Sequence, residues 1–366
     1  MLKAVITITT DLGETFYPEN IDLVATIRQT EDEGEVYLRR KLQWPASARS
    51  LPISFDLSRS DVEWPACMHV AVKAPQPVRS LGFMSPIVDV WSSTLNPTKG
   101  HFEASRRVER RFVSSTEQTL SLLEDAGDSI ARHLWDGSQA LAHHIDQTIS
   151  LQLPSELSLL EYVLVSATYR RLRVLELGCG CGTVGISLAQ AVPDCKVILT
   201  DLPEVTELVN ANIERMKPAM ASSVAFEPLD WEQPLPETVL ARTTDLVIVS
   251  ECTYNTDTLQ PLVATLSALT VRSPRAVIVV STKTRHSSEA VFFDMMKEAG
   301  FTQDSTMRCS LPGLPGDGYA DRATDVGLHV FHGSKHRLSM SPRVRSEEDV
   351  PQKSCSSSSS KRVSFR

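Results

Sequence analysis

The stretch that most constrains the fold of this chain is VLELGCGCGTVG, at residues 174–185. It joins an apolar, strand-like segment to a turn with glycines at alternate positions and then to the start of a helix. Because Gly178, Gly180 and Gly182 have no Cβ atoms, a ligand can lie directly against the backbone of this turn. The helix expected from Thr183 directs its unpaired N–H groups and the positive end of its dipole towards that ligand. The pattern predicts an α/β fold with a nucleotide-like cofactor at this turn.

Two kinds of cofactor are compatible with such a turn. Residues 180–185 satisfy the dinucleotide pattern G-x-G-x-x-G, and Asp201 follows at about the spacing of a ribose-binding acid. Glu176, however, lies inside the preceding strand, where an enzyme that binds a pyrophosphate usually has an apolar residue. S-adenosylmethionine carries an ammonium and a sulfonium and no phosphate, so carboxylates at Glu176 and Asp201 suit it better than an anionic dinucleotide. We therefore expect S-adenosylmethionine, with a dinucleotide as the alternative.

The chain beyond this turn continues to alternate between strands and helices. Three further strand-like runs each end in polar residues: 196–200, 224–229 and 245–250. In an open parallel sheet the carboxyl ends of the strands meet in one ligand crevice. We expect Asp201 to accept hydrogen bonds from both ribose hydroxyls, and Asp230 and Trp231 to meet the amine and the face of an adenine. The alternative is that these side chains are ordinary cap and packing residues.

Together these segments resemble the seven-β-strand protein lysine methyltransferases, a methyltransferase-like family of class I enzymes that use S-adenosylmethionine. The resemblance covers about residues 127–333 and rests on four motifs: LELGCG at 175–180, TDLPE at 200–204, DW at 230–231 and ECTY at 251–254. It implies that one set of residues contacts the cofactor: Trp135, Gly178, Gly180, Asp201, Trp231 and Ser250. The reading from the residues adds four more cofactor-binding candidates: Glu176, Cys179, Gly182 and Asp230.

One departure from the family pattern concerns the candidate catalytic residues. The family's signature after the fourth strand is Asp-x-x-Tyr, whereas this chain has Glu251 and Tyr254, which keeps the charge but lengthens the arm by one methylene. The resemblance implies that both face the transferred methyl. We expect Glu251 to accept a hydrogen bond from the incoming nitrogen and Tyr254 to supply a wall and a hydroxyl acceptor. The alternative is a purely structural role for Glu251.

The expected reaction is transfer of a methyl group to an amine nitrogen, with a protein lysine as the favoured acceptor. The alternative acceptor is an amine or amide of an amino-acid-derived metabolite, and a minor alternative is a non-catalytic, cofactor-binding scaffold. Lys283, Arg285 and His286 follow an apolar strand at 276–280, and they either bind an acceptor carboxylate or are solvated. The sequence leaves this choice open.

Charge, apolar content and cysteines exclude several classes of protein. A net charge of −8 weighs against binding to nucleic acid, which needs several phosphates neutralised. No run approaches the about 18 uncharged apolar residues of a membrane span, and the first residues lack a signal-peptide pattern, so we expect a cytoplasmic protein. The seven cysteines form no C-x-x-C pair, which indicates neither a metal site nor a disulfide framework.

The fold expected from these patterns is a Rossmann-like, doubly wound sheet of seven strands with an antiparallel edge, formed by residues 101–334. Residues 1–100 predict a small β-rich region followed by a linker. Residues 335–366, with serines throughout 356–360, predict a disordered, basic and serine-rich tail. Residues 312–318 are rich in turn formers and are a candidate lid.

Some elements before the glycine turn can also be placed. Four β-prone runs are expected in the N-terminal region: 3–10, 35–42, 53–57 and 69–73. Residues 110–124 fit a hairpin or the start of a helix, and the resemblance favours the hairpin. Helices are expected at 128–149, capped by Asp128 or Ser129, and at 154–170.

Overall fold

A computed structural model describes residues 1–31, 34–58, 60–73, 85, 87–126, 129–151, 156–283, 285, 290–311 and 325–333. The chain divides into Met1–His336 and a second part, Arg337–Arg366. The expected disordered tail at 335–366 and the candidate lid at 312–318 lie outside the described residues.

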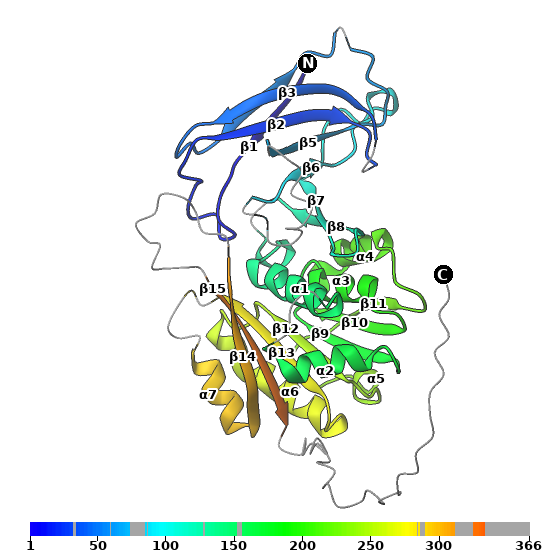
Figure 1. Ribbon diagram of the computed structural model, residues 1–366, viewed down its shortest axis with the longest axis vertical. Helices are drawn as coiled ribbons and strands as arrows, with labels where there is room; N and C mark the ends of the chain where they lie inside the picture. The colour runs from blue at the N-terminus through cyan, green and yellow to red at the C-terminus, as the bar shows by residue number, and fades with distance from the viewer. Residues whose placement is uncertain are drawn as a thin grey trace, which may run out of the picture. The chain divides into compact units, whose positions relative to one another are not determined.

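The larger sheet has seven strands in the order β11-β10-β9-β12-β13-β15-β14 (Figure 1). Its strands are β9 (Leu172–Leu177), β10 (Cys195–Asp201), β11 (Ser223–Pro228), β12 (Leu246–Ser250), β13 (Val277–Lys283), β14 (Phe301–Ser310) and β15 (Asp325–Gly333). The first five in the chain are parallel, and β15 pairs antiparallel with both β13 and β14. The prediction of a Rossmann-like sheet with an antiparallel edge is confirmed.

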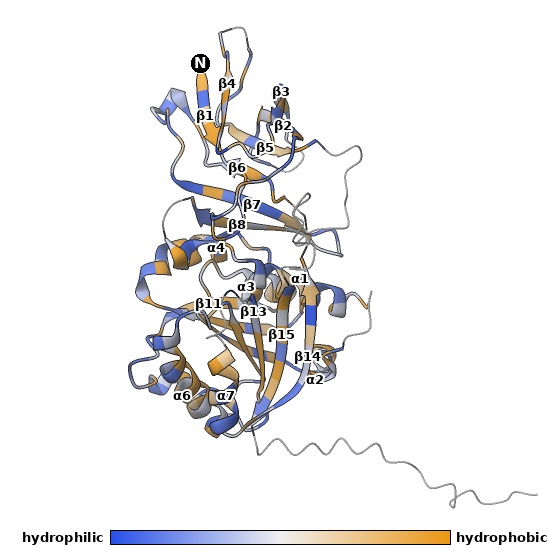
Figure 2. Cartoon of the chain, turned by 90° about the vertical axis from the view of Figure 1, so that its left-hand side faces the viewer, coloured by the Kyte–Doolittle hydropathy of each residue, from blue (hydrophilic) through white to orange (hydrophobic). Residues whose placement is uncertain are grey.

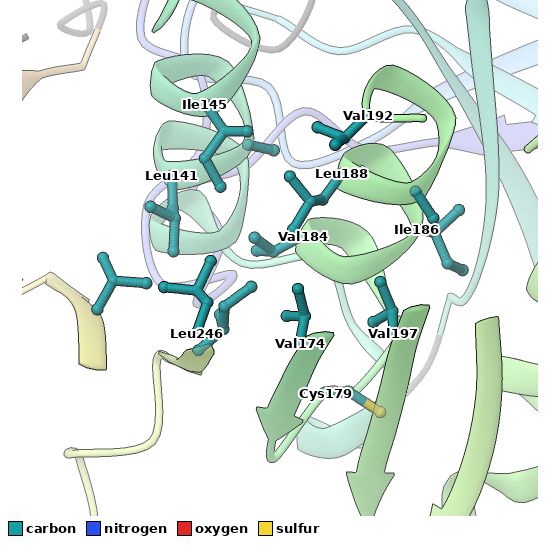
Figure 3. Packing of buried hydrophobic residues seen from close by; sticks show 14 of the residues in the cluster. Leu141, Ile145, Val174, Cys179, Val184, Ile186, Leu188, Val192, Val197 and Leu246 are labelled. Carbon is teal, nitrogen blue, oxygen red and sulfur yellow. The ribbon is translucent and has the colours of Figure 1, made fainter. Parts of the chain in front are cut away.

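Helices cover both faces of this sheet because its central strands are apolar on both sides. On β12, Leu246 and Ile248 pack with one hydrophobic cluster while Val247 and Val249 pack with another. The first cluster includes α1 (Asp136–Ile149), α2 (Ser158–Ser166), α3 (Thr183–Ala191) and α4 (Thr206–Arg215), and the second includes α5 (Glu237–Leu240), α6 (Thr256–Arg272) and α7 (Val291–Glu298). Figure 3 shows side chains of α1 and α3 meeting above β9. This doubly wound arrangement brings the carboxyl ends of the parallel strands to one edge.

The N-terminal region forms a six-stranded antiparallel sheet in the order β3-β2-β5-β6-β7-β8, with a separate pair, β1-β4. These strands are β1 (Leu2–Ile6), β2 (Ile21–Arg28), β3 (Val36–Trp44), β4 (Leu51–Phe55), β5 (Cys67–Val72), β6 (Val90–Ser92), β7 (Arg107–Val113) and β8 (Thr119–Asp125). Side chains of β1 and β4 pack with those of β2 and β5 in a shared apolar cluster. The four expected β-prone runs overlap β1, β3, β4 and β5, whereas β2 and β6 were not expected.

The segment 110–124 is a hairpin, as the resemblance favoured, and it belongs to the N-terminal sheet. β7 pairs with β8, and β6 pairs with β7 through Trp91 and Glu109. Figure 2 shows that β7 carries both hydrophilic and hydrophobic residues, as its sequence RVERRFV indicates. Hydrogen bonding in this sheet therefore continues past residue 100, and the expected domain boundary there stays a prediction.

The helix expected at 128–149 is wrong at its start. The chain forms a 3-10 turn, η3 (Ile130–Arg132), then runs extended, and α1 begins only at Asp136 with Trp135 as its N-cap. The buried carboxylate of Glu124 explains the interruption, because it accepts the Leu134 N–H at 3.0 Å and pairs with His133 Nδ1 at 2.8 Å. The helix expected at 154–170 is α2, which is shorter. Among the described helices, none is long and apolar enough to cross a membrane.

A core truncation tests this packing. Ile248 is 0% exposed on the central strand β12, so Ile248→Ala is expected to lower the free energy of unfolding by about 2–5 kcal/mol in a urea titration followed by circular dichroism. Val271→Ala is the control, because Val271 is 74% exposed and its truncation should cost no more than about 0.5 kcal/mol. Equal effects of the two substitutions would contradict the assigned core.

Candidate active site

The glycine turn after β9 is in close contact with the loops that follow two other strands. Gly178 has a φ of 66°, and a Cβ at this position would strike Cys252 Sγ and lie 3.3 Å from the ring of Trp231. Trp231 follows β11 and Cys252 follows β12. The turn, the DW motif and the ECTY motif, which are far apart in the sequence, therefore converge at the carboxyl edge of the sheet.

Glu176 lies beneath this turn with only 1% of its surface exposed. Its Oε2 accepts the backbone N–H of Gly185, in the first turn of α3, at 2.8 Å. Burial raises the pKa of Glu176 to about 8, although the bond from Gly185 opposes the shift. The carboxyl group thus joins β9 to α3 and holds the turn in place, and its expected contact with the cofactor stays a prediction.

Asp201 ends β10 and faces the glycine turn directly. Its Oδ2 accepts the Gly180 N–H at 2.8 Å and its Oδ1 accepts the Leu202 N–H at 2.7 Å. Burial raises the pKa of Asp201 against these two bonds. A carboxylate oxygen has two lone pairs. Each oxygen can therefore still accept a hydrogen bond from a hydroxyl group, as binding of a ribose requires.

The next strand brings Asp230 and Trp231 to the same edge. The Leu229 N–H donates to the Asp201 carbonyl at 2.8 Å, and Asp230 Oδ1 accepts the Glu232 N–H at 2.9 Å. The indole Nε1 of Trp231 is buried and has no hydrogen-bond partner among the described residues. A buried donor without a partner is costly, so a ligand that supplies an acceptor here is favoured. This feature fits a nucleoside-like cofactor.

The remaining cofactor candidates have mainly local partners. Cys179 N–H donates to the Thr200 carbonyl at 3.0 Å, and Gly182 is the N-cap of α3. The buried Ser250 hydroxyl lies 2.8 Å from Ser281 Oγ and 3.3 Å from Ser138 Oγ. These contacts join β12 to β13 and to the first turn of α1.

Glu251 directly follows β12 in an unusual backbone conformation, with a φ of 57°. Its N–H donates to the Ser281 carbonyl at 2.9 Å, and its Oε2 accepts from Arg285 Nη1 at 2.6 Å. Its Oε1 is buried and has no hydrogen-bond partner in the part of the chain that the structure describes. A Cβ added at Gly137 would clash with the Glu251 side chain, which would then have to move. Burial raises the pKa of Glu251 to about 7, although Arg285 opposes this shift. The site therefore contains a buried carboxylate oxygen that can accept a hydrogen bond from a ligand.

Glu251 is part of a buried set of charged residues, which we call the charge cluster: Asp11, Asp136, Glu251, Lys283 and Arg285. Lys283 Nζ lies 2.7 Å from Asp136 Oδ2 and 3.0 Å from Asp11 Oδ1. Arg285 Nη2 lies 2.8 Å from Asp11 Oδ2. With Glu251 ionised, three carboxylates face two cations, a net charge of −1. Lys283 and Arg285 therefore match neither expected alternative, because they are largely buried and bind the protein's own carboxylates. His286 lies outside the described residues.

Trp135 and Tyr254 have different surroundings. The guanidinium carbon of Arg285 is 5.2 Å from the centre of the Trp135 ring, whose Nε1 donates to the Ile130 carbonyl at 3.1 Å. Tyr254 is half-exposed, and its pKa is raised by burial and by acidic groups that include Asp201. Trp135 therefore contacts the charge cluster, while Tyr254 lies towards the cofactor side. Their expected roles stay predictions.

Sequence reasoning missed Asp11 and Asp136. Asp136 had a local signal, because an acid in the first turn of a helix after Trp135 is typical of a helix start. Asp11 had none that points to this site, since its partner Lys283 is 272 residues away. Its neighbours Thr10 and Gly13 indicate only a turn.

The comparison with known families agrees with this geometry. The lysine methyltransferase family matches residues 114–299, just over half of the chain. The chain belongs to this family. It is thus an S-adenosylmethionine-dependent methyltransferase, and the resemblance noted from the four motifs is confirmed.

Individual relatives cover the methyltransferase to different extents. The UPF0665 family protein C23C4.06c of Schizosaccharomyces pombe is 26% identical over 80% of this chain and 85% of its own length. Calmodulin-lysine N-methyltransferase of Arabidopsis thaliana is 32% identical over 41% of this chain and 47% of that protein. Protein-lysine N-methyltransferase EFM6 of Saccharomyces cerevisiae is 28% identical over 49% of this chain and 74% of its own length.

The close approach at Gly178 predicts a loss of cofactor binding on substitution. Gly178→Ala introduces a methyl group against Cys252 and Trp231, so the loops that form the site must separate, and the Kd for S-adenosylmethionine measured by calorimetry should rise at least tenfold. Gly300→Ala is the matched control, because Gly300 also has a positive φ, 85°, but a Cβ there meets no atom within 4 Å. Both variants carry a backbone strain of about 1–2 kcal/mol. A similar Kd in both variants would contradict the convergence of the loops on Gly178.

Proposed function

We propose that this methyltransferase transfers a methyl group from S-adenosylmethionine to the side-chain nitrogen of a lysine in a protein substrate. The single observation that carries the proposal is the buried Oε1 of Glu251, which has no hydrogen-bond partner among the described residues and belongs to a cluster with a net charge of −1 when Glu251 is ionised. An amine cation supplies both the proton donor and the positive charge that this cluster lacks. Relatives named as protein-lysine and calmodulin-lysine methyltransferases support a protein as the source of that amine.

The cofactor is proposed to lie along the glycine turn. Asp201 would bind the ribose hydroxyls, Asp230 and Trp231 the adenine, and Gly178 and Gly180 would let the backbone approach the ligand. When bound, S-adenosylmethionine supplies a methyl carbon attached to a positively charged sulfur. Asp201, a carboxylate beside the turn, favours a cation over an anionic dinucleotide, whereas Glu176, with a pKa of about 8, is mostly protonated at neutral pH and adds little charge.

Glu251 is proposed to hold the acceptor nitrogen on the methyl side. Its position at the end of β12, which pairs with β9 through Val249 and Leu177, supports a place beside the glycine turn. Oε1 would accept a hydrogen bond from the lysine nitrogen and orient its lone pair towards the methyl carbon. The lysine loses its proton to water before the transfer. As the nitrogen gains positive charge during the transfer, the carboxylate stabilises it.

We further propose that the enzyme acts in the cytoplasm. Six cysteines among the described residues are free and five of these are buried. Free thiols are typical of a reducing compartment, which supports this location.

The direct test uses S-adenosylmethionine labelled on its methyl group. The purified enzyme and the labelled cofactor are incubated with a cell lysate separated into protein and small-molecule fractions. We expect label in the protein fraction, and mass spectrometry of the digested proteins should find it on lysine. Label found solely in the metabolite fraction would instead identify a small amine or amide as the acceptor.

Two substitutions separate the cofactor side from the acceptor side. Asp201→Ala is expected to abolish binding of S-adenosylmethionine. Glu251→Ala should leave the Kd for the cofactor nearly unchanged and slow turnover at least tenfold, about 1.4 kcal/mol of barrier. Glu298→Ala, which removes an exposed acid at the end of α7, is the control and should change neither quantity.

The pH dependence gives the Glu251 variant a second readout. Because the pKa of Glu251 is about 7, its carboxylate is mostly ionised above pH 7 and mostly protonated below it. Wild-type turnover should therefore fall more steeply below pH 7 than lysine deprotonation alone explains, and Glu251→Gln should lack this additional fall. Unchanged turnover in both Glu251 variants would remove the residue from the mechanism.

A further inference from the structure

A tight turn of the N-terminal region reaches the charge cluster. Thr9 and Phe16 form an antiparallel bridge, and inside it the Thr10 N–H donates to the Thr15 carbonyl at 3.0 Å and the Gly13 N–H to the Thr10 carbonyl at 2.9 Å. Asp11 lies in this turn, where a side chain is normally solvated, yet its side chain is only 4% exposed. Its burial results from its contacts with the segment that ends β13.

Asp11 shares both cations of the cluster with other carboxylates. Its Oδ1 forms an ion pair with Lys283, which also pairs with Asp136. Its Oδ2 forms an ion pair with Arg285, which also pairs with Glu251. The two nitrogens of Arg285 that make these bonds differ: Nη2 donates to Asp11 at 2.8 Å and Nη1 to Glu251 at 2.6 Å. The guanidinium group therefore bridges a carboxylate of the N-terminal region and the carboxylate at the candidate acceptor site.

We propose that Asp11 is a positioning residue of the acceptor site, which holds Arg285 so that Glu251 keeps one carboxylate oxygen for the acceptor amine. This inference rests on the proposed function, because it assigns Asp11 to the same lysine-binding site. The N-terminal region, on this view, forms part of the active site and supplies one of its charges.

The charges of the cluster give the physical reason. With Asp11 the cluster has three carboxylates and two cations, so an incoming ammonium neutralises it. Without Asp11 two carboxylates face two cations, and Arg285 is left with Glu251 as its one carboxylate partner in the cluster. Guanidinium and carboxylate then form a neutral pair, which can become bidentate and take up Oε1. An ammonium entering a buried, neutral site would lose its hydration without gaining a compensating charge.

The surroundings of Asp11 are consistent with a stable ionised carboxylate. Burial acts to raise the pKa of Asp11, but the charges of Lys283 and Arg285 outweigh burial and lower it. Asp136 and Glu251 are the other acids that face these cations. At neutral pH the Asp11 charge is therefore present for the role proposed.

The test compares Asp11→Asn with a matched substitution in the same region. Asp22→Asn removes the same charge from an exposed carboxylate whose partner is Lys73, outside the cluster. Labelling is measured with the full-length protein, with the protein fraction of the lysate as the acceptor at increasing concentration. We expect Asp11→Asn to raise the half-saturating acceptor concentration at least tenfold, with the Kd for S-adenosylmethionine and the melting temperature close to those of wild type. Asp22→Asn should change none of the three.

A second variant separates positioning from structural damage. Adding Arg285→Gln to Asp11→Asn removes the guanidinium that would neutralise Glu251 and restores the net charge of −1. Because loss of Arg285 raises the pKa of Glu251, the comparison is made well above pH 7, where Glu251 is ionised, and there the double variant should recover a half-saturating acceptor concentration within about threefold of wild type. A variant that had merely lost its fold would not be rescued by removing a second partner of the cluster.

The outcomes that overturn the inference differ from those that overturn the proposed function. Labelled lysine in the wild type, with Asp11→Asn equal to it, would reject the role of Asp11 alone. So would a tenfold loss that Arg285→Gln fails to rescue, or a loss accompanied by an equal loss of cofactor affinity. Absence of any labelled lysine in the wild type would reject the proposed function, and the inference with it.

Discussion

Carboxylates held out of water at the carboxyl edge of the seven-stranded sheet are the constraint on which this structure depends. An unpaired buried charge is costly, so each carboxylate must find a donor or change its protonation. Glu176 is paired with the N–H of Gly185, Asp201 with those of Gly180 and Leu202, and Asp11 with two side-chain cations. These bonds fix the glycine turn to α3 and to β10 on one side and assemble the charge cluster on the other. On the proposed cofactor side and on the proposed acceptor side alike, buried carboxylates are stabilised by N–H donors or by cations.

How far the sequence could predict the site depended on whether its contacts are local. The proposed cofactor side consists of residues at the ends of consecutive strands, so the spacing of Gly178, Asp201 and Trp231 was sufficient to predict that they converge. The acceptor side is made by contacts of long sequence separation. Glu251 was predicted as a site residue because it follows a strand, and that role stays a prediction; the role of its partner Arg285 was left undecided, and the contact with Asp11 was missed. No local pattern in a surface turn reports a cation that lies 272 residues away.

The errors in secondary structure have a similar origin. The helix before the glycine turn was expected to start at Asp128 or Ser129, since the apolar spacing continues through Leu134. The Glu124 carboxylate accepts the Leu134 N–H and pairs with His133. These tertiary contacts override the helical propensity of the segment and hold the chain extended up to Trp135. Strand β2 was missed although it is an inner strand of its sheet, between β3 and β5. Four of the five residues at 23–27 are apolar or small, on both faces of the strand, so the alternation that marks a half-buried strand is weak.

The net charge of the cluster also explains how it could favour the reaction over simple binding. An acceptor lysine arrives as a cation, is neutral when it attacks, and becomes a cation again as the new bond forms. A site with a charge of −1 stabilises both charged states and offers least to the neutral amine. Stabilisation therefore increases from the neutral amine to the transition state, which favours the methyl-transfer step itself, while the same charge makes the preceding loss of the lysine proton harder. If Arg285 neutralised Glu251 completely, this difference would disappear. On the proposed role of Asp11, sharing Arg285 between two carboxylates lets the cations stabilise the cluster without fully neutralising Glu251.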